Sequence, residues 1–433
     1  MVFSLALAAA IVTAPLAHAL PQAISSAPSS TDASSSSLPT TQGALTTIAL
    51  AASIPALPPG PDATSYPRDG ELHAPFPAPY TPAGGLGTNG SEPIYVVQSD
   101  FDYQSIALAL YQEWIELDLF HNGLARFTPE EFEAEGLDAE DRYLIQFMAE
   151  QEVGHSQLLS NILGEFAPVQ CTYSYPYNTV REFLDFCQKL TRFGESGVYG
   201  FLNHLNSREA AQLLLQSITT EARQQMIFRQ FDGLFPMPVW FEAGIPQSWG
   251  WTLLAPYISS CPANQTRLSW QNFPALTVVN QPNPARANAN LTGLNETVSS
   301  ISPDESCGES CKAAITNNRS IPLSYPGREV YFSWEAPGQA VGPNNSYVTS
   351  TAAGAPAFVA WVSQLNVTYS ALTNITGNTG TTLQPDVSTF AGDPAINGTM
   401  FVAITDANLT VTPFNVSMIN PHVVAGPALY QAG

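Results

Sequence analysis

Apolar residues recur every three or four positions between residues 99 and 232, and this spacing predicts amphipathic helices. Four segments stand out, over about 99–127, 137–165, 178–206 and 208–232. Proline and glycine fall between the segments, as in FTPEEFEAEG and FAPVQCTYSYPYN, and no proline falls inside them. Long helices joined by loops of modest length are the ingredients of a four-helix bundle, which we therefore expect over residues 99–232.

The hydrophobic pattern changes after residue 232. Residues 233–320 begin with an aromatic and proline-rich stretch, which predicts an irregular wrap and linker packed on the helices, because its large side chains need burial. Residues 321–433 contain β-branched and aromatic runs separated by turn residues, and these predict a β-rich, sandwich-like domain. The expected strands lie at 330–334, 357–369, 399–405 and 409–416. The fold class is therefore a mainly α bundle followed by a β-rich region.

The N-terminal residues have the pattern of a secretory leader. An apolar stretch from Val2 to Ala14 is followed by Ala17-His18-Ala19, so residues 1–19 are predicted to be a signal peptide, although no basic residue precedes the stretch. Residues 20–98 are rich in Ser, Thr and Pro and are expected to form a disordered leader and an extended arm. No segment reaches the ~20 apolar residues of a membrane-spanning helix, so no span is expected.

The net charge of the chain argues against two classes of binding partner. It has 36 acidic residues and 14 Lys and Arg, with a formal net charge of -22 and no basic cluster, which argues against binding to nucleic acid or to an anionic membrane surface. Ten of eleven Asn-x-Ser/Thr triplets follow residue 260 and predict N-glycans. The triplets begin at Asn89, Asn264, Asn290, Asn295, Asn318, Asn344, Asn366, Asn374, Asn397, Asn408 and Asn415. We expect a secreted protein, extracellular or in the cell wall, with wall or matrix components as candidate partners.

Five cysteines fit the same compartment, because secreted proteins pair most of their thiols. We predict that Cys171 and Cys261 tie the ends of the helical region together and that Cys307 and Cys311 form a local clip. Cys187 lies in the helical pattern FLDFCQKL and is predicted to be a buried free thiol. The sequence does not set the oligomeric state.

Acidic residues inside the apolar stripes of the helices are the candidate functional residues. A lone buried carboxylate costs several kcal/mol, so it requires a partner such as a metal, an arginine or a shared proton. Glu152 and His155 lie three residues apart and so point the same way from one helix. The other helices place one glutamate each in their stripes, at Glu113, Glu195 and Glu221.

These residues carry a family resemblance. The order Glu113, Glu152-Val-Gly-His155, Glu195, Glu221-Ala-Arg-Gln224 resembles the ligand order of the ferritin-like superfamily, as do LYQEWIELDLF and AEQEVGHSQLL. The whole chain, including EARQQMIFRQFDGLFPMPVWFE and NPHVVAGPALYQAG, resembles fungal secreted ferritin-like proteins described as stress-response or sexual-development proteins. The resemblance implies a ferritin-like bundle with an iron or manganese site. Its metal ligands would be Glu113, Glu152, His155, Glu195, Glu221 and Gln224.

One position departs from the pattern, because residue 224 is Gln where the family has His. His121 and His204 do not replace it, since they lie roughly 12–13 Å along their helices from the expected site. Glu116 is a rival for Glu113. Alternatively, the acids belong to a hydrogen-bonded core, satisfied by Arg192, Arg223, Gln224 and His155.

Two functions therefore stay open. In one, the bundle is a di-iron or di-manganese oxidoreductase or a metal-handling protein. In the other, the carboxylate site is degenerate or non-catalytic, and the protein acts as a glycosylated scaffold linked to stress response or sexual development. Gln224 favours the second function, because an oxidase that cycles iron usually keeps both imidazoles. No Gly-x-Ser-x-Gly elbow and no phosphate-binding loop occurs in the sequence.

Overall fold

The computed structural model describes residues 95–232, 234, 236–263, 265, 267–282, 324–393 and 398–431. The predicted signal peptide, most of the leader and the Cys307–Cys311 pair lie outside these residues. So do six of the glycosylation triplets, at Asn89, Asn264, Asn290, Asn295, Asn318 and Asn397. The bundle and the β-rich region both fall within one compact unit, residues 79–433.

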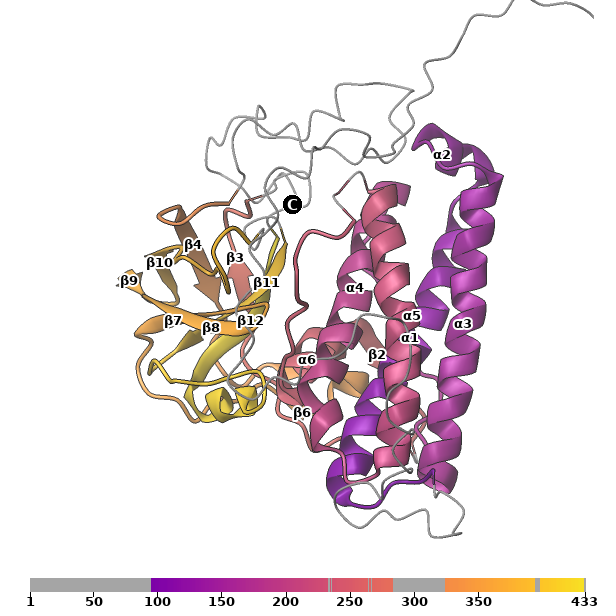
Figure 1. Ribbon diagram of the computed structural model, residues 1–433, viewed down its shortest axis with the longest axis horizontal. Coiled ribbons are helices and arrows are strands. Elements are labelled where there is room, and N and C mark those ends of the chain that lie inside the picture. Colours follow the sequence, from indigo (N-terminus) through magenta and orange to yellow (C-terminus); the bar gives the residue numbers. More distant parts are fainter. Residues whose placement is uncertain are drawn as a thin grey trace, which may run out of the picture. The chain divides into compact units, whose positions relative to one another are not determined.

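Four long helices confirm the predicted bundle (Figure 1). They are α1 (Asp100–Arg126), α3 (Ala139–Leu163), α4 (Val180–Phe201) and α5 (Arg208–Phe231), with the short helix α2 (Pro129–Ala134) before α3. Helix α4 ends earlier than the predicted residue 206, because the chain tightens into the 3-10 turn η2 (Leu202–His204). In the part of the chain that the structure describes, no helix has the length and apolar character that a membrane crossing requires.

Side-chain caps explain where the long helices begin. Ser99 accepts a hydrogen bond from the Asp102 amide at the start of α1, and Thr179 and Ser207 cap α4 and α5 in the same way. Asp138 forms a capping box with Asp141 at the start of α3. Each cap satisfies amides that the helix itself leaves without partners, and a cap of this kind stabilises a helix by about 1 kcal/mol.

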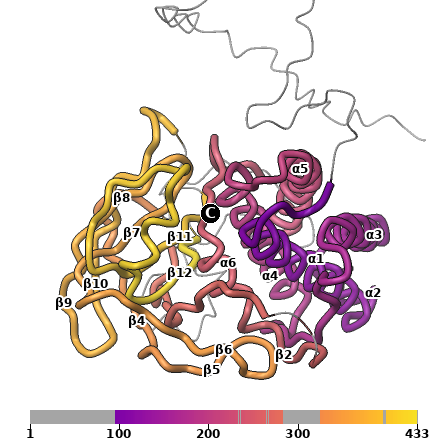
Figure 2. The backbone as a smooth tube through the Cα atoms, turned by 90° about the horizontal axis from the view of Figure 1, so that it is seen from below, coloured from indigo at the N-terminus to yellow at the C-terminus, as the bar shows by residue number. Residues whose placement is uncertain are grey.

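Helix α1 lies at the centre of the bundle (Figure 2). It packs mainly against α3 and α4, while α5 packs mainly on α4 and touches α3 little. The buried carboxylate of Asp102 accepts hydrogen bonds from the amides of Asn206 and Ser207, which fixes the start of α1 against the start of α5. Because α1 has neighbours on several sides, its acidic residues Glu113 and Glu116 are held inside the protein.

The segment 233–320, expected to be irregular, contains regular structure and corrects that expectation. It holds α6 (Gln247–Leu254), followed by η3 (Ala255–Tyr257), β2 (Ile258–Ser260) and β3 (Leu276–Val278). Trp249 and Trp251 of α6 are fully buried, which meets the predicted need of the aromatic stretch for burial. Strand β2 pairs with β1 (Thr172–Tyr173), which follows the turn η1 (Gly164–Phe166).

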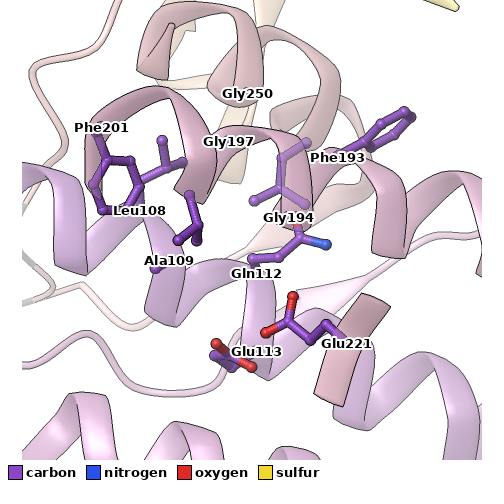
Figure 3. A pocket seen from close by; sticks show the side chains of 12 residues that line it. Leu108, Ala109, Gln112, Glu113, Phe193, Gly194, Gly197, Phe201, Glu221 and Gly250 are labelled. Carbon is purple, nitrogen blue, oxygen red and sulfur yellow. The ribbon is translucent and has the colours of Figure 1, made fainter. Parts of the chain in front are cut away.

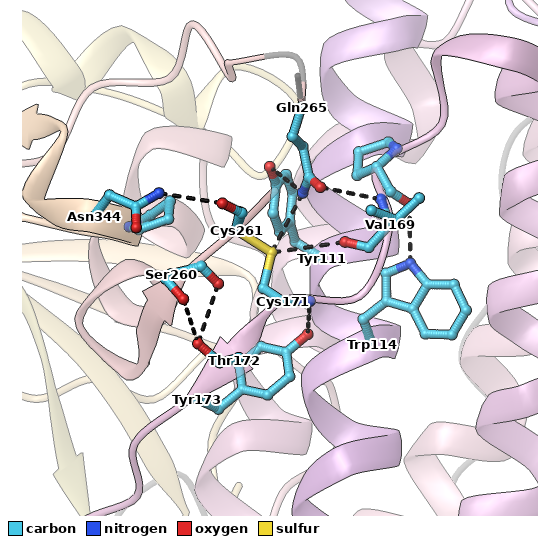
Figure 4. The surroundings of a disulfide bond; sticks show 12 residues. Tyr111, Trp114, Val169, Cys171, Thr172, Tyr173, Ser260, Cys261, Gln265 and Asn344 are labelled. Atoms are coloured by element: carbon cyan, nitrogen blue, oxygen red, sulfur yellow. Dashed lines mark hydrogen bonds between the residues drawn. A yellow bond between two sulfur atoms is a disulfide. The ribbon is translucent and has the colours of Figure 1, made fainter. Parts of the chain in front are cut away.

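The predicted disulfide between Cys171 and Cys261 is present beside this strand pair (Figure 4). Cys187 is a buried free thiol, as predicted. The hydroxyls of Thr172 and Ser260 are hydrogen-bonded at 2.6 Å across the two strands. The disulfide and the strand pair therefore join the chain after α3 to the chain after α6.

Two four-stranded antiparallel sheets confirm the predicted β-rich region. One has the order β3-β4-β10-β9, and the other has the order β12-β11-β7-β8. Their strands are β4 (Glu329–Trp334), β7 (Phe358–Ser363), β8 (Asn366–Ala371), β9 (Thr373–Thr376), β10 (Thr379–Leu383), β11 (Thr399–Thr405) and β12 (Val423–Gln431). The sheets share one hydrophobic core, as in a sandwich. A smaller pair, β5 (Ala340–Val341) and β6 (Tyr347–Val348), encloses the turn η9 (Pro343–Asn345).

Two of the expected strands differ from the structure. The segment 357–369 is a hairpin, β7 and β8, instead of one strand. The segment 409–416 is not a strand, because Pro413 has no amide hydrogen and the Asn415 side chain accepts a hydrogen bond from the Thr412 amide, which forms a turn before η11 (Val416–His422).

The second sheet is buried on both faces. Val359 and Trp361 of β7 belong to the sandwich core, whereas Ala360 and Val362 belong to the core that includes the bundle. Because alternate residues of a strand face opposite sides, β7 must be apolar on both faces. The helices and the second sheet thus share a continuous hydrophobic core, and the Gln188 amide on α4 donates to the Gln431 side chain on β12.

Two glycines of α4 give a test of this packing. A methyl group at Gly197 would meet no atom within 4 Å, so Gly197→Ala is expected to stabilise the protein by about 0.5–1 kcal/mol through helix propensity. A methyl group at Gly200 would lie 1.8 Å from the Ile245 carbonyl oxygen, so Gly200→Ala is expected to destabilise by about 1–3 kcal/mol. Urea unfolding of the two variants measures both effects, and equal changes would contradict this packing of α4.

Candidate metal centre

Four side chains from three helices converge inside the bundle. Glu113 comes from α1, Glu152 and His155 come from α3, and Glu221 comes from α5. One ligand atom of each residue lies within 4.8 Å of the corresponding atoms of the other three. The three glutamates are at most 2% exposed, and 11% of the His155 side chain reaches solvent. We call these four residues the carboxylate cluster.

The imidazole of His155 faces the three carboxylates with one nitrogen. Its Nδ1 lies 3.1 Å from Glu152 Oε2, 3.3 Å from Glu113 Oε2 and 3.7 Å from Glu221 Oε1. Its other nitrogen, Nε2, lies 2.9 Å from Thr220 Oγ1 on α5. The spacing of Glu152 and His155 along α3 therefore places both ligand atoms at one point in the interior, as the sequence pattern predicted.

The carboxylates of the cluster are buried and repel one another, so they require positive charge or protons nearby. Burial raises the pKa of Glu113 well above its usual range, and the charge of Glu152 raises it further. The pKa of Glu221 is raised in the same way, by burial and then by Glu113. Burial alone would lower the pKa of His155, but Glu152, Glu221 and Glu116 outweigh it and raise this pKa to about 9. The cluster therefore holds protons unless another cation takes their place.

Gln224 reaches the cluster through its amide nitrogen. Nε2 donates hydrogen bonds to Glu152 Oε1 at 2.5 Å and to Gln151 Oε1 at 3.3 Å. The amide oxygen, which is the only atom of Gln224 able to bind a metal, has no hydrogen-bond partner. In this structure Gln224 thus acts as a hydrogen-bond donor that holds Glu152.

Glu195 does not join the carboxylate cluster. Its Oε2 lies 3.0 Å from Arg192 Nη1, and its Oε1 accepts a hydrogen bond from the Tyr199 hydroxyl at 2.9 Å. Arg192 also forms an ion pair with Glu242, in the segment that follows α5. Of the two arginines expected to partner the buried acids, Arg192 therefore forms an ion pair with Glu195, whereas Arg223 is exposed.

Helix α4 approaches the cluster region with a small residue. A methyl group at Gly194 would lie 2.6 Å from Gln112 Cγ, so the Gln112 side chain occupies the space that a larger residue on α4 would need. Gln112 Nε2 donates to the Leu190 carbonyl at 2.7 Å and holds this arrangement. The sequence pattern missed Gln112, because an amide on an apolar stripe carries no distinctive signal.

Glu116, the rival of Glu113, is also buried, and neither of its carboxyl oxygens accepts a hydrogen bond. Burial and then the charge of Glu152 raise its pKa well above the usual range, so it lies close enough to feel the cluster. The other histidines do not supply a second imidazole: His121 is exposed, and His204 Nε2 lies 2.6 Å from the Phe414 carbonyl.

A small cavity adjoins the cluster (Figure 3). Its volume is ≈ 20 Å³, enough for about one water-sized molecule, and its lining is mostly apolar. Glu113 and Glu221 contribute its carboxylates, at one end of the group of side chains, and Phe201 and Leu108 lie toward the other end. Gly194, Gly197 and Gly250 leave the space open on the side of α4 and α6.

The residues of the cluster fit a divalent metal ion. Glu113 Oε2 is buried without a hydrogen-bond partner, and it points to the same place as His155 Nδ1 and two other carboxylates. Carboxylate oxygens with one imidazole suit iron and manganese, whereas no cysteine, the ligand of softer ions, belongs to the cluster. Among the described residues, no Lys or Arg forms an ion pair with the three glutamates of the cluster or with Glu116.

Known proteins agree with this architecture. Residues 99–233 match the family described as a ferritin-like domain. The chain is 55% identical to Protein rds1 of Schizosaccharomyces pombe over 361 residues, which are 83% of this chain and 87% of that protein. The chain therefore belongs to the same family as the fission-yeast Protein rds1, and its helical bundle is a ferritin-like domain.

Proposed function

We propose that this chain is a secreted fungal glycoprotein whose bundle binds one divalent metal ion, iron or manganese, through Glu113, Glu152, His155 and Glu221. The convergence of four ligand atoms within 4.8 Å in a buried site carries this proposal. Buried carboxylates without a cation repel each other and are costly to desolvate, so a cluster of this kind requires compensation. The described part of the chain offers His155 as the only basic side chain paired with the cluster.

The protein side of the site has a clear division of roles. Three carboxylates would supply negatively charged oxygen ligands, and His155 Nδ1 would supply a neutral nitrogen ligand. Gln224 holds Glu152 in place through a hydrogen bond. The surrounding apolar core keeps bulk water away from the cluster. Iron or manganese, when bound, would supply Lewis acidity and one-electron redox chemistry. The adjoining cavity has room for about one water-sized molecule beside Glu113 and Glu221.

We favour one ion instead of the two that the family resemblance implies. A second ion would need ligands from Glu195 and from residue 224. Glu195 is already bonded to Arg192 and Tyr199, and Gln224 presents its amide nitrogen to Glu152. The same losses argue for metal binding or metal handling over di-metal oxidase activity, because two of the six expected ligands, Glu195 and Gln224, are engaged elsewhere.

Secretion and glycosylation are part of the proposal. The Cys171–Cys261 disulfide suits an oxidising compartment, and the triplet asparagines Asn344, Asn374 and Asn408 are exposed on the β-rich region. We further propose, from the family resemblance, a role in stress response or sexual development near the cell wall. Peptide mapping of protein from the culture medium, before and after enzymatic removal of N-glycans, tests the glycosylation. Intact, unmodified triplets in all three peptides would contradict it.

The metal content of the purified protein is the decisive measurement. Elemental analysis of protein secreted from a fungal host should find about one iron or manganese ion per chain. The variant with both Glu152→Ala and His155→Ala should bind no metal, because it removes both ligands that α3 supplies, which are two of the four in the site. Glu150→Ala is the matched control, since Glu150 lies on the same helix and is exposed.

Other stoichiometries would change the conclusion. Two ions per chain would make the centre dinuclear and would overturn the proposal of a single ion. No metal after reconstitution with Fe²⁺ and Mn²⁺ would overturn the metal proposal and leave a glycosylated scaffold with a degenerate site.

A further inference from the structure

The hydroxyl of Thr220 links α5 to the outer nitrogen of His155. Thr220 Oγ1 donates a hydrogen bond to the Ser217 carbonyl at 2.7 Å and lies 2.9 Å from His155 Nε2. A hydroxyl has one hydrogen to donate. Because that hydrogen is used on the Ser217 carbonyl, Thr220 must accept the hydrogen bond from His155, so Nε2 carries a proton.

The proton on Nε2 determines what the inner side of the ring presents. In a neutral imidazole with Nε2 protonated, Nδ1 has a free lone pair. In the metal-free protein, the hydrogen bond between Nδ1 and Glu152 Oε2 at 3.1 Å places a second proton at this position, with Glu113 Oε2 at 3.3 Å. A divalent ion can take the place of that second proton, because Nδ1 and the three carboxylates converge on one point, and Nδ1 then binds the ion through its lone pair. The orientation that Thr220 imposes is therefore the orientation of a metal ligand.

We infer that Thr220 is a positioning residue, which fixes the tautomer and the ring orientation of His155 so that Nδ1 binds the metal. This inference rests on the proposed metal site. Thr220 directly precedes the ligand Glu221, so a single turn of α5 supplies one ligand and orients another. Helix α5 presents two groups to the imidazole, the Thr220 hydroxyl at 2.9 Å from Nε2 and Glu221 Oε1 at 3.7 Å from Nδ1. Groups that hold the second nitrogen of a ligand histidine typically affect metal affinity by about 10–100-fold.

Three substitutions on α5 isolate the hydroxyl. Thr220→Val keeps the shape and removes the acceptor, whereas Thr220→Ser keeps the acceptor. Thr219→Val is the matched control, because Thr219 is exposed and its hydroxyl donates to the Gln216 carbonyl. Zn²⁺ serves as the probe, since it is diamagnetic and accepts the same nitrogen and oxygen ligands. Competition with a chelator gives the affinity, and long-range ¹H–¹⁵N correlations on ¹⁵N-histidine protein identify the metal-bound nitrogen.

The wild-type protein should bind Zn²⁺ through Nδ1 of His155, with Nε2 protonated. Thr220→Val should lower the affinity by about 10–100-fold and give a mixture of bound nitrogens, while Thr220→Ser and Thr219→Val keep the wild-type pattern. Circular dichroism of the zinc-free variants separates a lost fold from a lost orientation.

Two results would overturn the inference and leave the metal site intact. One is binding through Nε2 in the wild-type protein, which does not depend on any variant folding. The other is an unchanged affinity and nitrogen pattern in Thr220→Val. Failure of the wild-type protein to bind Zn²⁺, Fe²⁺ or Mn²⁺ would instead remove the proposed function, and this inference with it.

Discussion

Raising the pH from 5 to 9 is expected to destabilise the metal-free protein, by on the order of 3 kcal/mol through His155 alone. The folded-state pKa of His155 is about 9, against 6.5 for an ordinary histidine, and each unit of pKa difference is about 1.36 kcal/mol. A group whose pKa is raised by folding stabilises the folded state below its unfolded pKa. That stabilisation is lost as the pH rises through the folded pKa, so the loss falls between about pH 6.5 and 9.

The buried glutamates act in the same direction. The pKa values of Glu113, Glu116 and Glu221 are raised by burial and by neighbouring carboxylates, so the folded state keeps protons that the unfolded chain releases above about pH 4.5. Stability therefore falls as the pH rises toward their folded pKa values. A bound divalent ion takes the place of these protons, so at a fixed metal concentration its stabilising effect grows as the pH rises and opposes this fall.

Urea unfolding at pH 5, 7 and 9, with a chelator or with saturating Mn²⁺, measures the effect. The metal-free curve should fall with pH, and saturation at about 100 times the Kd should add roughly 2.7 kcal/mol at a given pH. Glu116→Gln should flatten the metal-free curve, because it removes one buried charge, while Glu150→Gln, on the exposed face of α3, should leave it unchanged. A metal-free stability that rises with pH would show that these carboxylates are paired with a cation already.

Much of the fold could be predicted from the sequence because its strongest patterns are local. The apolar spacing and the turn residues placed the four long helices, and the caps at Ser99, Asp138, Thr179 and Ser207 show why those boundaries were close. The strands were harder to predict from the sequence. Strand β12, with Pro427 inside it, carries a proline that argues against a strand, and β9 and β10 are polar and threonine-rich, so their pairing is set by long-range contacts.

The site was predicted in part, for a related reason. Helical spacing places Glu152 beside His155 and puts Glu113 and Glu221 in the interior, which is a property of each helix alone. The rotation of α4 is not such a property. It depends on Gly194 fitting under Gln112 and on Gly200 touching the Ile245 segment, and it leaves Glu195 with Arg192 instead of the cluster. Thr220 was missed for the same reason, since its role exists only across the gap between two helices.

Removal of the Cys171–Cys261 disulfide is expected to lower the free energy of unfolding by about 4–5 kcal/mol. The two cysteines are 90 residues apart, and a cross-link over so long a loop removes much of the entropy of the unfolded chain. The closed loop contains α4, α5 and α6, so the unfolded ensemble that gains freedom includes half of the bundle.

Urea unfolding of the variant with Cys171→Ser and Cys261→Ser measures this loss, and the same experiment on the wild-type protein with a reductant is the control. Both should give a similarly lowered stability, because Cys187 is buried and unpaired and the predicted Cys307–Cys311 clip closes only a short loop. At temperatures where the variant remains folded, metal binding should survive, since Glu113, Glu152 and Glu221 are brought together by helix packing. A loss of metal without unfolding would instead mean that the disulfide holds α5 in the register that places Glu221 in the cluster.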